Sequence, residues 1–225
     1  MTTTTTRPTI VATAPLCPSD MVDLADGATD VTGGVVWPGA HALQGWIDAR
    51  DTAQWVGADV LELGCGTGYC GIAAALRGAR VHLTDGDEAA VALAVRNCAA
   101  NAAAVSSAGG ATTTAVLAWT EDGAADDCSR DVVLAAEVVY NEAVTRLLLR
   151  TAARALRPGG EFVLAFVPRI LKFGVADMVA AAAEAGLAHE GGDQDAAGLA
   201  GGDAAAVEEL DGTGACVMVF RRPAG

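Results

Sequence analysis

The stretch VLELGCGTG, residues 60–68, joins an apolar run to three glycines at alternate positions. Glycine inside ordered structure costs roughly 0.5–1 kcal/mol relative to alanine, so three of them indicate a tight turn or a close approach of the backbone to another molecule. Residues 59–64 predict a buried strand, and residues 69–78 predict a helix that ends at Gly78. A bare turn between a strand and a helix presents backbone N–H groups at the positive end of the helix, where ligands bind. A tight turn without a ligand is the alternative interpretation.

Short apolar runs and longer helix-compatible segments alternate along the rest of the chain. Further strands are predicted at 80–85, 112–119, 131–139, 161–168 and 215–222, and further helices at 87–101, 141–160 and around 174–186. This alternation predicts a parallel, doubly wound sheet with right-handed crossovers, and strands that are apolar on both faces agree with it. Residues 189–206, rich in Gly, Ala and Asp, carry no pattern that predicts structure.

Composition bounds the kind of protein. The chain of 225 residues is 52% hydrophobic, which predicts one folded domain over 30–225 after a flexible polar lead-in over 1–29. A net charge of −14 repels phosphate backbones, so nucleic acid is not expected as a partner. No apolar run approaches the roughly 20 residues that span a bilayer, and no stripe demands a partner, so we expect no membrane contact and a monomer. Six cysteines without CxxC or zinc-ligand spacing predict no metal site and reduced thiols in the cytoplasm, with the nucleus as the alternative.

Two acidic residues flank the glycine turn. Glu62 lies two residues before the glycines, and Asp85 ends the second strand, placed to accept hydrogen bonds from both hydroxyls of a ribose. Gly66, Gly68 and Gly71 also satisfy the dinucleotide fingerprint G-x-G-x-x-G, with Asp85 at about the usual interval of ~20 residues. Glu62 would repel a pyrophosphate but tolerates a cationic sulfonium, so charge favours S-adenosyl-L-methionine (SAM) over NAD.

Several stretches in order resemble one family. LELGCGTG (61–68) and LTDGDE (83–88) resemble the cofactor-binding core of seven-strand methyltransferases. With GGVVWPGAHALQGWI (33–47), LAWTED (117–122) and LAAEVVYNEA (134–143), the set is similar to the protein-lysine methyltransferases that carry an acidic-x-x-Tyr motif after the fourth strand, the methyltransferase-like 21 and calmodulin-lysine methyltransferase type. The resemblance implies an α/β fold: a doubly wound, mostly parallel, seven-stranded Rossmann-like sheet with helices on both faces.

The resemblance also implies cofactor contacts. Trp37 would cover SAM from the N-terminal side, Trp119 would flank the adenine, and Ala136 would touch the cofactor beside its reactive end. The glycine turn would line the methionine part, and Asp85 would hold the ribose. The candidate cofactor-binding residues are Trp37, Glu62, Gly64, Cys65, Gly66, Gly68, Asp85, Gly86, Trp119 and Ala136.

Glu137 and Tyr140 form the acidic-x-x-Tyr motif and are the candidate catalytic residues. Many members of the group carry Asp where this chain has Glu137. The hypothesis is that Glu137 orients an incoming lysine amine and that Tyr140 walls its channel. The Asn-Pro-Pro-Tyr tetrapeptide of methyltransferases that act on amide or base nitrogens does not occur.

The predicted function is SAM-dependent methyl transfer to a lysine ε-amine of a protein substrate, whose lysine lies in a basic patch that the acidic surface attracts. Substrate specificity is expected to reside in residues 1–45 and 169–215. Three alternatives stay open at this point: a small-molecule methyltransferase on the same cofactor, a cofactor-binding module without turnover, and a dinucleotide-dependent oxidoreductase.

Overall fold

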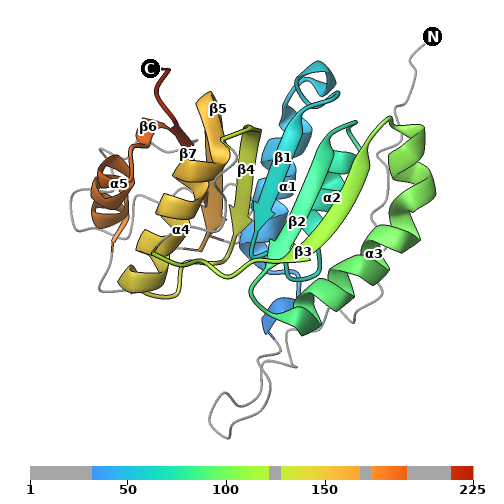
Figure 1. The fold of residues 1–225 in the computed structure, drawn as a ribbon, viewed down its shortest axis with the longest axis horizontal. Coiled ribbons are helices and arrows are strands. Elements are labelled where there is room, and N and C mark those ends of the chain that lie inside the picture. The colour runs from blue at the N-terminus through green and yellow to red at the C-terminus, as the bar shows by residue number, and fades with distance from the viewer. Residues whose placement is uncertain (1–31, 122–127, 168–173, 192–213, 225) are drawn as a thin grey trace, which may run out of the picture.

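A seven-stranded sheet forms the centre of the molecule (Figure 1). The computed structural model describes residues 32–121, 128–167, 174–191 and 214–224. The strand order is β3-β2-β1-β4-β5-β7-β6. The strands are β1 (Asp59–Leu63), β2 (Arg80–Asp85), β3 (Ala111–Val116), β4 (Arg130–Ala136), β5 (Leu156–Phe166), β6 (Ala188–Gly191) and β7 (Cys216–Arg221).

The sheet is mostly parallel, as the sequence predicts. β1 to β5 pair in parallel, while β7 runs antiparallel to both β5 and β6. The order reverses between β1 and β4, so the loops after these two strands diverge and leave a crevice at their carboxyl ends. The sequence did not predict β6 as a strand. It lies at the start of residues 189–206, the segment for which the sequence predicted no structure.

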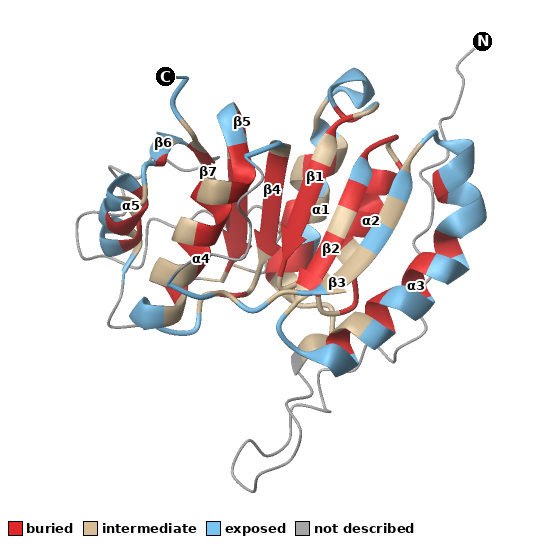
Figure 2. Ribbon diagram, in the orientation of Figure 1, coloured by how far each residue is buried: buried red, intermediate tan, exposed pale blue. Residues whose placement is uncertain are grey.

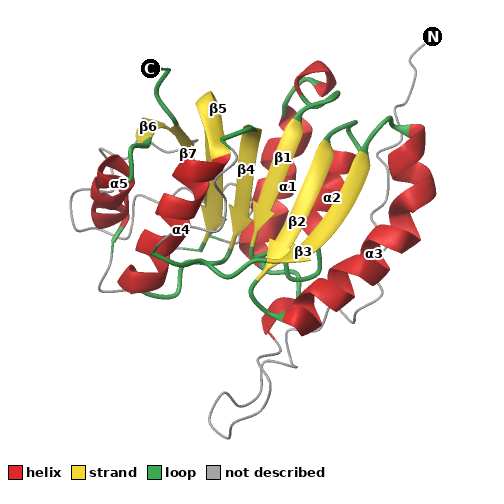
Figure 3. Cartoon of the chain, viewed as in Figure 1, coloured by secondary structure: helices red, strands yellow, loops and turns green. Residues whose placement is uncertain are grey.

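Helices cover both faces of the sheet (Figure 3). α1, α2 and α3 pack on one face and α4 and α5 on the other. Neighbouring strand residues serve opposite faces, so that Val60 contacts the first group and Leu61 the second. The helices are α1 (Pro38–Ala49), α2 (Tyr69–Ala75), α3 (Glu88–Ser107), α4 (Glu142–Ala155) and α5 (Val175–Glu184), with short 3-10 turns η2 (Thr32–Gly34) and η3 (Thr52–Gln54).

The boundary between α4 and β5 differs from the prediction. The sequence continues the helix to residue 160, whereas α4 ends at Ala155 and residues 157–160 belong to β5. The reason is a partner far away in the chain: Gly159 N–H donates to Arg222 O at 2.8 Å, and Arg222 N–H donates to Gly160 O at 3.0 Å. Pairing with Arg222, the residue that follows β7, therefore extends β5 backwards.

One region of the sheet, over β2 and β3, is partly exposed on its outer face (Figure 2). Among the described residues no helix lies between β3 and β4, so the outer face of β2 and β3 is left open. His82 and Thr113 occupy this face and hydrogen bond to each other at 2.8 Å. This uncovered face explains why β3 alternates in burial instead of being apolar throughout.

α3 is longer than the predicted 87–101. Its length and composition would allow it to cross a membrane, which the sequence analysis did not anticipate. In this fold α3 packs along β2 and β3, and its buried face includes the polar Asn97 and Asn101. That packing buries one face of α3.

Candidate active site

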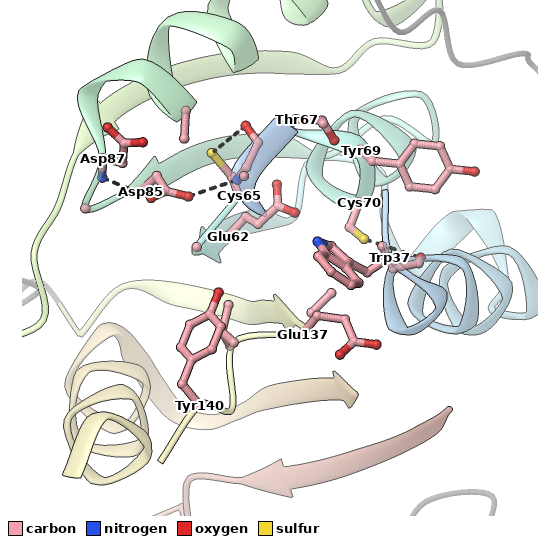
Figure 4. A pocket seen from close by; sticks show the side chains of 18 of the residues that line it. Trp37, Glu62, Cys65, Thr67, Tyr69, Cys70, Asp85, Asp87, Glu137 and Tyr140 are labelled. Atoms are coloured by element: carbon pink, nitrogen blue, oxygen red, sulfur yellow. Dashed lines mark hydrogen bonds between the residues drawn. The ribbon is translucent and has the colours of Figure 1, made fainter. Parts of the chain in front are cut away.

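A cavity of about 420 Å³ opens at the carboxyl ends of β1, β2 and β4. Of the candidate residues from the sequence, all line it except Gly68, including Glu137 and Tyr140 (Figure 4). Gly68 is packed instead: a Cβ there would lie 2.9 Å from Leu83 Cδ2. Its φ of 78° makes it the left-handed residue that starts α2, so its role is to shape the turn.

The glycine turn brings bare backbone to the cavity. Gly64 and Gly66 have φ of 70° and 49°, in the left-handed region that favours glycine. A Cβ on Gly64 would lie 2.5 Å from Val138 Cγ1, and one on Gly66 would lie 2.9 Å from Gly33 O. Side chains at these positions would therefore fill the space between the turn and its neighbours.

Asp85 lies at the end of β2 beside the turn. Its Oδ2 accepts from Gly66 N–H at 2.9 Å and its Oδ1 accepts from Asp87 N–H at 3.0 Å. These bonds fix the carboxylate at the cavity wall, and each oxygen keeps acceptor capacity for a ligand hydroxyl. The arrangement suits a ribose with two hydroxyls.

Glu62 is a buried carboxyl on the cavity wall, only 3% exposed. Oε2 accepts from Gly71 N–H at 2.9 Å. Burial raises the pKa of Glu62 to about 8, the Gly71 N–H opposes the rise, and the negative charge of Asp85 adds to it. A cation entering the cavity would favour the ionised form of Glu62.

Trp119 and Trp37 bound the cavity on different sides. Trp119 Nε1–H is buried and has no acceptor within the described part of the chain. The ring of Trp119 lies against Gly64, 3.5 Å from the Cβ that an alanine would place there. Trp37 stands just before α1 and faces the cavity from the N-terminal segment.

Tyr140 and Glu137, the residues of the acidic-x-x-Tyr motif, differ in their surroundings. Tyr140 is 57% exposed, and its phenol points across the cavity toward the strand ends that carry Glu62 and Asp85 (Figure 4). Glu137 lines the same cavity, but its Oε1 accepts from Gly39 N–H of α1 at 2.8 Å.

The charges of the cavity select between the two cofactors that the sequence allows. Among the described residues, its lining contains the carboxyls Glu62, Asp85, Asp87 and Glu137, and no lysine or arginine. The amides of Gly66 and Gly71, which a dinucleotide would need for its phosphates, already donate to carboxylates. The site therefore fits a cationic nucleoside such as SAM and does not fit a pyrophosphate.

Comparison with known sequences decides the family. Residues 17–172 match the profile of the lysine methyltransferase family. The chain belongs to the lysine methyltransferase family. Its cofactor is SAM, and the cavity has a volume within the roughly 300–1,000 Å³ usual for such sites.

Two mouse proteins are similar in sequence to the chain. EEF1A lysine methyltransferase 3 (Mus musculus) is 34% identical over 130 residues, 58% of this chain and 53% of that protein. Methyltransferase-like protein 22 (Mus musculus) is 33% identical over 159 residues, 61% of this chain and 40% of that protein. The chain thus matches about half or less of the length of these relatives.

Solved structures support the fold. The magnesium protoporphyrin IX methyltransferase of Synechocystis PCC 6803 with bound SAM has a TM-score of 0.58 at 18% identity, over 81% of this chain and 77% of that one. That enzyme is named for a porphyrin substrate. The fold alone therefore does not identify the atom that accepts the methyl group, and this atom has to be argued from the site.

Sequence reasoning missed several residues that build the cavity. Gly33 packs against the glycine turn, and Gly39 donates to Glu137. Val144 and Leu147 line the cavity from α4. The last two carry a signal, because apolar residues three apart share a helix face. Both glycines lie in the stretch 33–47, but pairing with residues distant in sequence has no local signal.

Proposed function

We propose that this lysine methyltransferase transfers a methyl group from SAM to the ε-amine of a lysine in a protein substrate. The observation that supports it best is the cavity itself, whose described residues combine carboxylates, bare backbone and aromatic walls and include no basic residue. A cavity of this charge attracts a cationic cofactor and a lysine side chain, and it repels acidic substrates.

Bound SAM supplies an electrophilic methyl group on its sulfonium. The protein's part is to align the amine nitrogen with the methyl carbon and the leaving sulfur, and to exclude water. A lysine amine must first lose its proton, against a reference pKa of ~10.4. The apolar surfaces of Trp37, Val138 and Leu147 lower the amine pKa by disfavouring the ammonium form.

Tyr140 is proposed to wall the entry of the lysine side chain. Its ring is exposed at the cavity and stands opposite Glu62 and Asp85 (Figure 4). An aromatic face attracts an ammonium with about 0.5–2 kcal/mol and then guides the stem inward. The sequence analysis assigned Glu137 to orienting the amine, whereas in the structure its carboxylate accepts from Gly39 N–H.

A basic patch around the target lysine is the proposed feature of the partner. Asp87 and Glu88 are exposed beside the cavity, and among the described residues neither forms an ion pair with an arginine. The relative named for EEF1A supports a protein as the acceptor. A cytoplasmic or nuclear location and a monomeric state remain predictions.

The experiment is methyl transfer from methyl-tritiated SAM into a whole-cell protein extract. The proposal expects label in methyllysine after protein hydrolysis, and no label in an aliquot whose lysine amines were acetylated beforehand. The chain carries a single lysine, Lys172, so self-labelling is confined to one side chain. Label in small molecules alone, in residues other than lysine, or nowhere would overturn the proposal.

A further inference from the structure

Glu137 has an unusual backbone. Its φ is 57°, and within the described ranges only one other residue besides glycines, Cys128, has a positive φ. Left-handed backbone is unfavourable for a residue with a Cβ, so surrounding contacts have to hold it. The backbone N–H of Glu137 donates to Ala165 O at 2.8 Å, which extends the β4–β5 ladder by one bond before the chain turns.

The Glu137 side chain meets the start of α1. Trp37, which precedes the helix, gives it no side-chain cap, and Pro38 has no N–H. Gly39 N–H is therefore the first amide of α1 that needs an acceptor, and Glu137 Oε1 supplies it at 2.8 Å. A carboxylate is favoured there by the positive end of the helix.

Gly39 leaves room for this contact. A Cβ at position 39 would lie 2.8 Å from Glu137 Oε1 and 2.9 Å from Glu137 Cγ. Contacts that short force one partner to move. Gly45, in the same helix, has nothing within 4 Å of the corresponding position.

The bond fixes one end of a segment that crosses the cavity. We call residues 33–37 the strap. Its first residue, Gly33, packs on the glycine turn so closely that a Cβ on Gly66 would lie 2.9 Å from Gly33 O. Val35, Val36 and Trp37 line the cavity. The strap is thus held after β1 at one end and after β4 at the other.

The Glu137 carboxylate is turned away from Tyr140, the proposed wall of the lysine entry (Figure 4). On β7, burial and then the negative charge of Glu137 raise the pKa of Cys216 to about 12, which agrees with a carboxylate lying toward β7. A group in this position acts on α1 more directly than on a substrate.

We propose that Glu137 is a positioning residue, which holds the first turn of α1 and the strap over the cofactor cleft through Gly39 N–H. This inference rests on the proposed function only in that SAM occupies the cleft. Loss of the bond frees the strap, so SAM binds more weakly while the methyl-transfer step at saturating SAM is largely preserved.

The test compares Glu137→Gly, Glu137→Gln, Gly39→Ala and the matched control Gly45→Ala. Glycine at 137 removes the carboxylate without straining the backbone, and Gly39→Ala displaces the carboxylate without changing Glu137. Three quantities are measured: the Kd for SAM by calorimetry, kcat and KM, and amide hydrogen exchange in the first turn of α1 without cofactor.

The proposal expects Glu137→Gly and Gly39→Ala each to raise the Kd for SAM about tenfold and to speed exchange in that turn, because a charge-assisted bond is lost. The double variant should be no worse than either single one, since both break the same bond. Glu137→Gln keeps an acceptor oxygen and should lose less, and Gly45→Ala should match the wild type.

The inference is overturned if Glu137→Gly lowers kcat at saturating SAM with an unchanged Kd while Gly39→Ala behaves as wild type. That result would assign Glu137 directly to the amine. Failure of the proposed function is separate, because it shows in the wild-type protein as no affinity for SAM or no methyllysine.

Discussion

At the scale of single residues, Glu62 couples cofactor binding to the release of its own proton. Its carboxyl is buried on the cavity wall, and its pKa is raised to about 8 from 4.5, first by burial. In the protein without cofactor the neutral acid therefore predominates at neutral pH. Binding of a cation requires the carboxylate, so a proton leaves when SAM enters.

Glu62→Gln tests this at the level of stability. Between pH 4.5 and about 8 the unfolded state has lost the proton of Glu62 while the folded state keeps it. The contribution of Glu62 to the free energy of unfolding should therefore be complete below pH 4.5 and be lost as the pH rises to about 8. Thermal scans without cofactor should show a steeper decline for the wild type than for Glu62→Gln. Parallel curves would show that Glu62 is not buried as a neutral acid.

The sequence could place Glu62 and Asp85 beside the glycine turn because both positions follow from strand ends. It could not show that their partners are the amides of Gly71 and Gly66. Nor could it show that Glu137 bonds to Gly39, 98 residues away. Such bonds depend on how loops meet in space, and local pattern carries no trace of them.

At the scale of elements, α3 supports the glycine turn. Asn97 is 1% exposed, and its Nδ2 donates to Thr67 O of that turn at 2.8 Å. Thr67 lines the cavity, so the helix and the cofactor site are mechanically joined. Asn101, one turn further along, donates to Asn97 O at 2.8 Å within the helix.

Asn97→Ala and Asn101→Ala form a matched pair. Both remove a buried amide and should lower stability by about 1–3 kcal/mol, measured by urea unfolding. Only Asn97→Ala should also weaken SAM binding, because it releases Thr67. Equal affinities in the two variants would separate α3 from the site.

The sequence predicted the strands with strong apolar patterns, β1, β2, β4 and β5, and that they run parallel. The failures have physical causes. The residues of β6 are few and partly polar, and β6 exists because β7 offers an edge. β5 starts early because residues 159 and 160 pair with Arg222. The lead-in 1–29, most of 189–206 and most of 169–215 lie outside the described residues.

At the scale of the whole molecule, the charged side chains at the amino ends of the strands differ from those at the carboxyl ends. Near the amino ends of the strands, arginines are paired with acids: Arg80 with Asp59 at 2.8 Å and Arg157 with Asp131 at 2.6 Å. At the carboxyl ends, the part of the cavity lining that the structure describes carries acids and no basic residue. These acids give the substrate approach a negative charge, which favours a basic substrate.

Salt dependence follows from this difference. Raising the salt from about 50 mM to about 300 mM shortens the screening length and should raise the KM for a basic protein substrate several-fold, with kcat little changed. Initial rates with a lysine-rich protein and with a neutral lysine-bearing peptide provide the measurement. The neutral peptide should respond weakly. Equal responses of the two substrates would show that the acidic face does not recruit them.

The central claim, that a cationic nucleoside occupies the cavity at the carboxyl ends of β1, β2 and β4, is tested most directly by titration calorimetry. The wild type should bind SAM and its demethylated product at one site. Asp85→Ala should bind SAM at least about tenfold more weakly, because it lacks the acceptor for the ribose, and NAD should give no binding. An absence of affinity for both SAM and the demethylated product, or binding of NAD in their place, would contradict the claim.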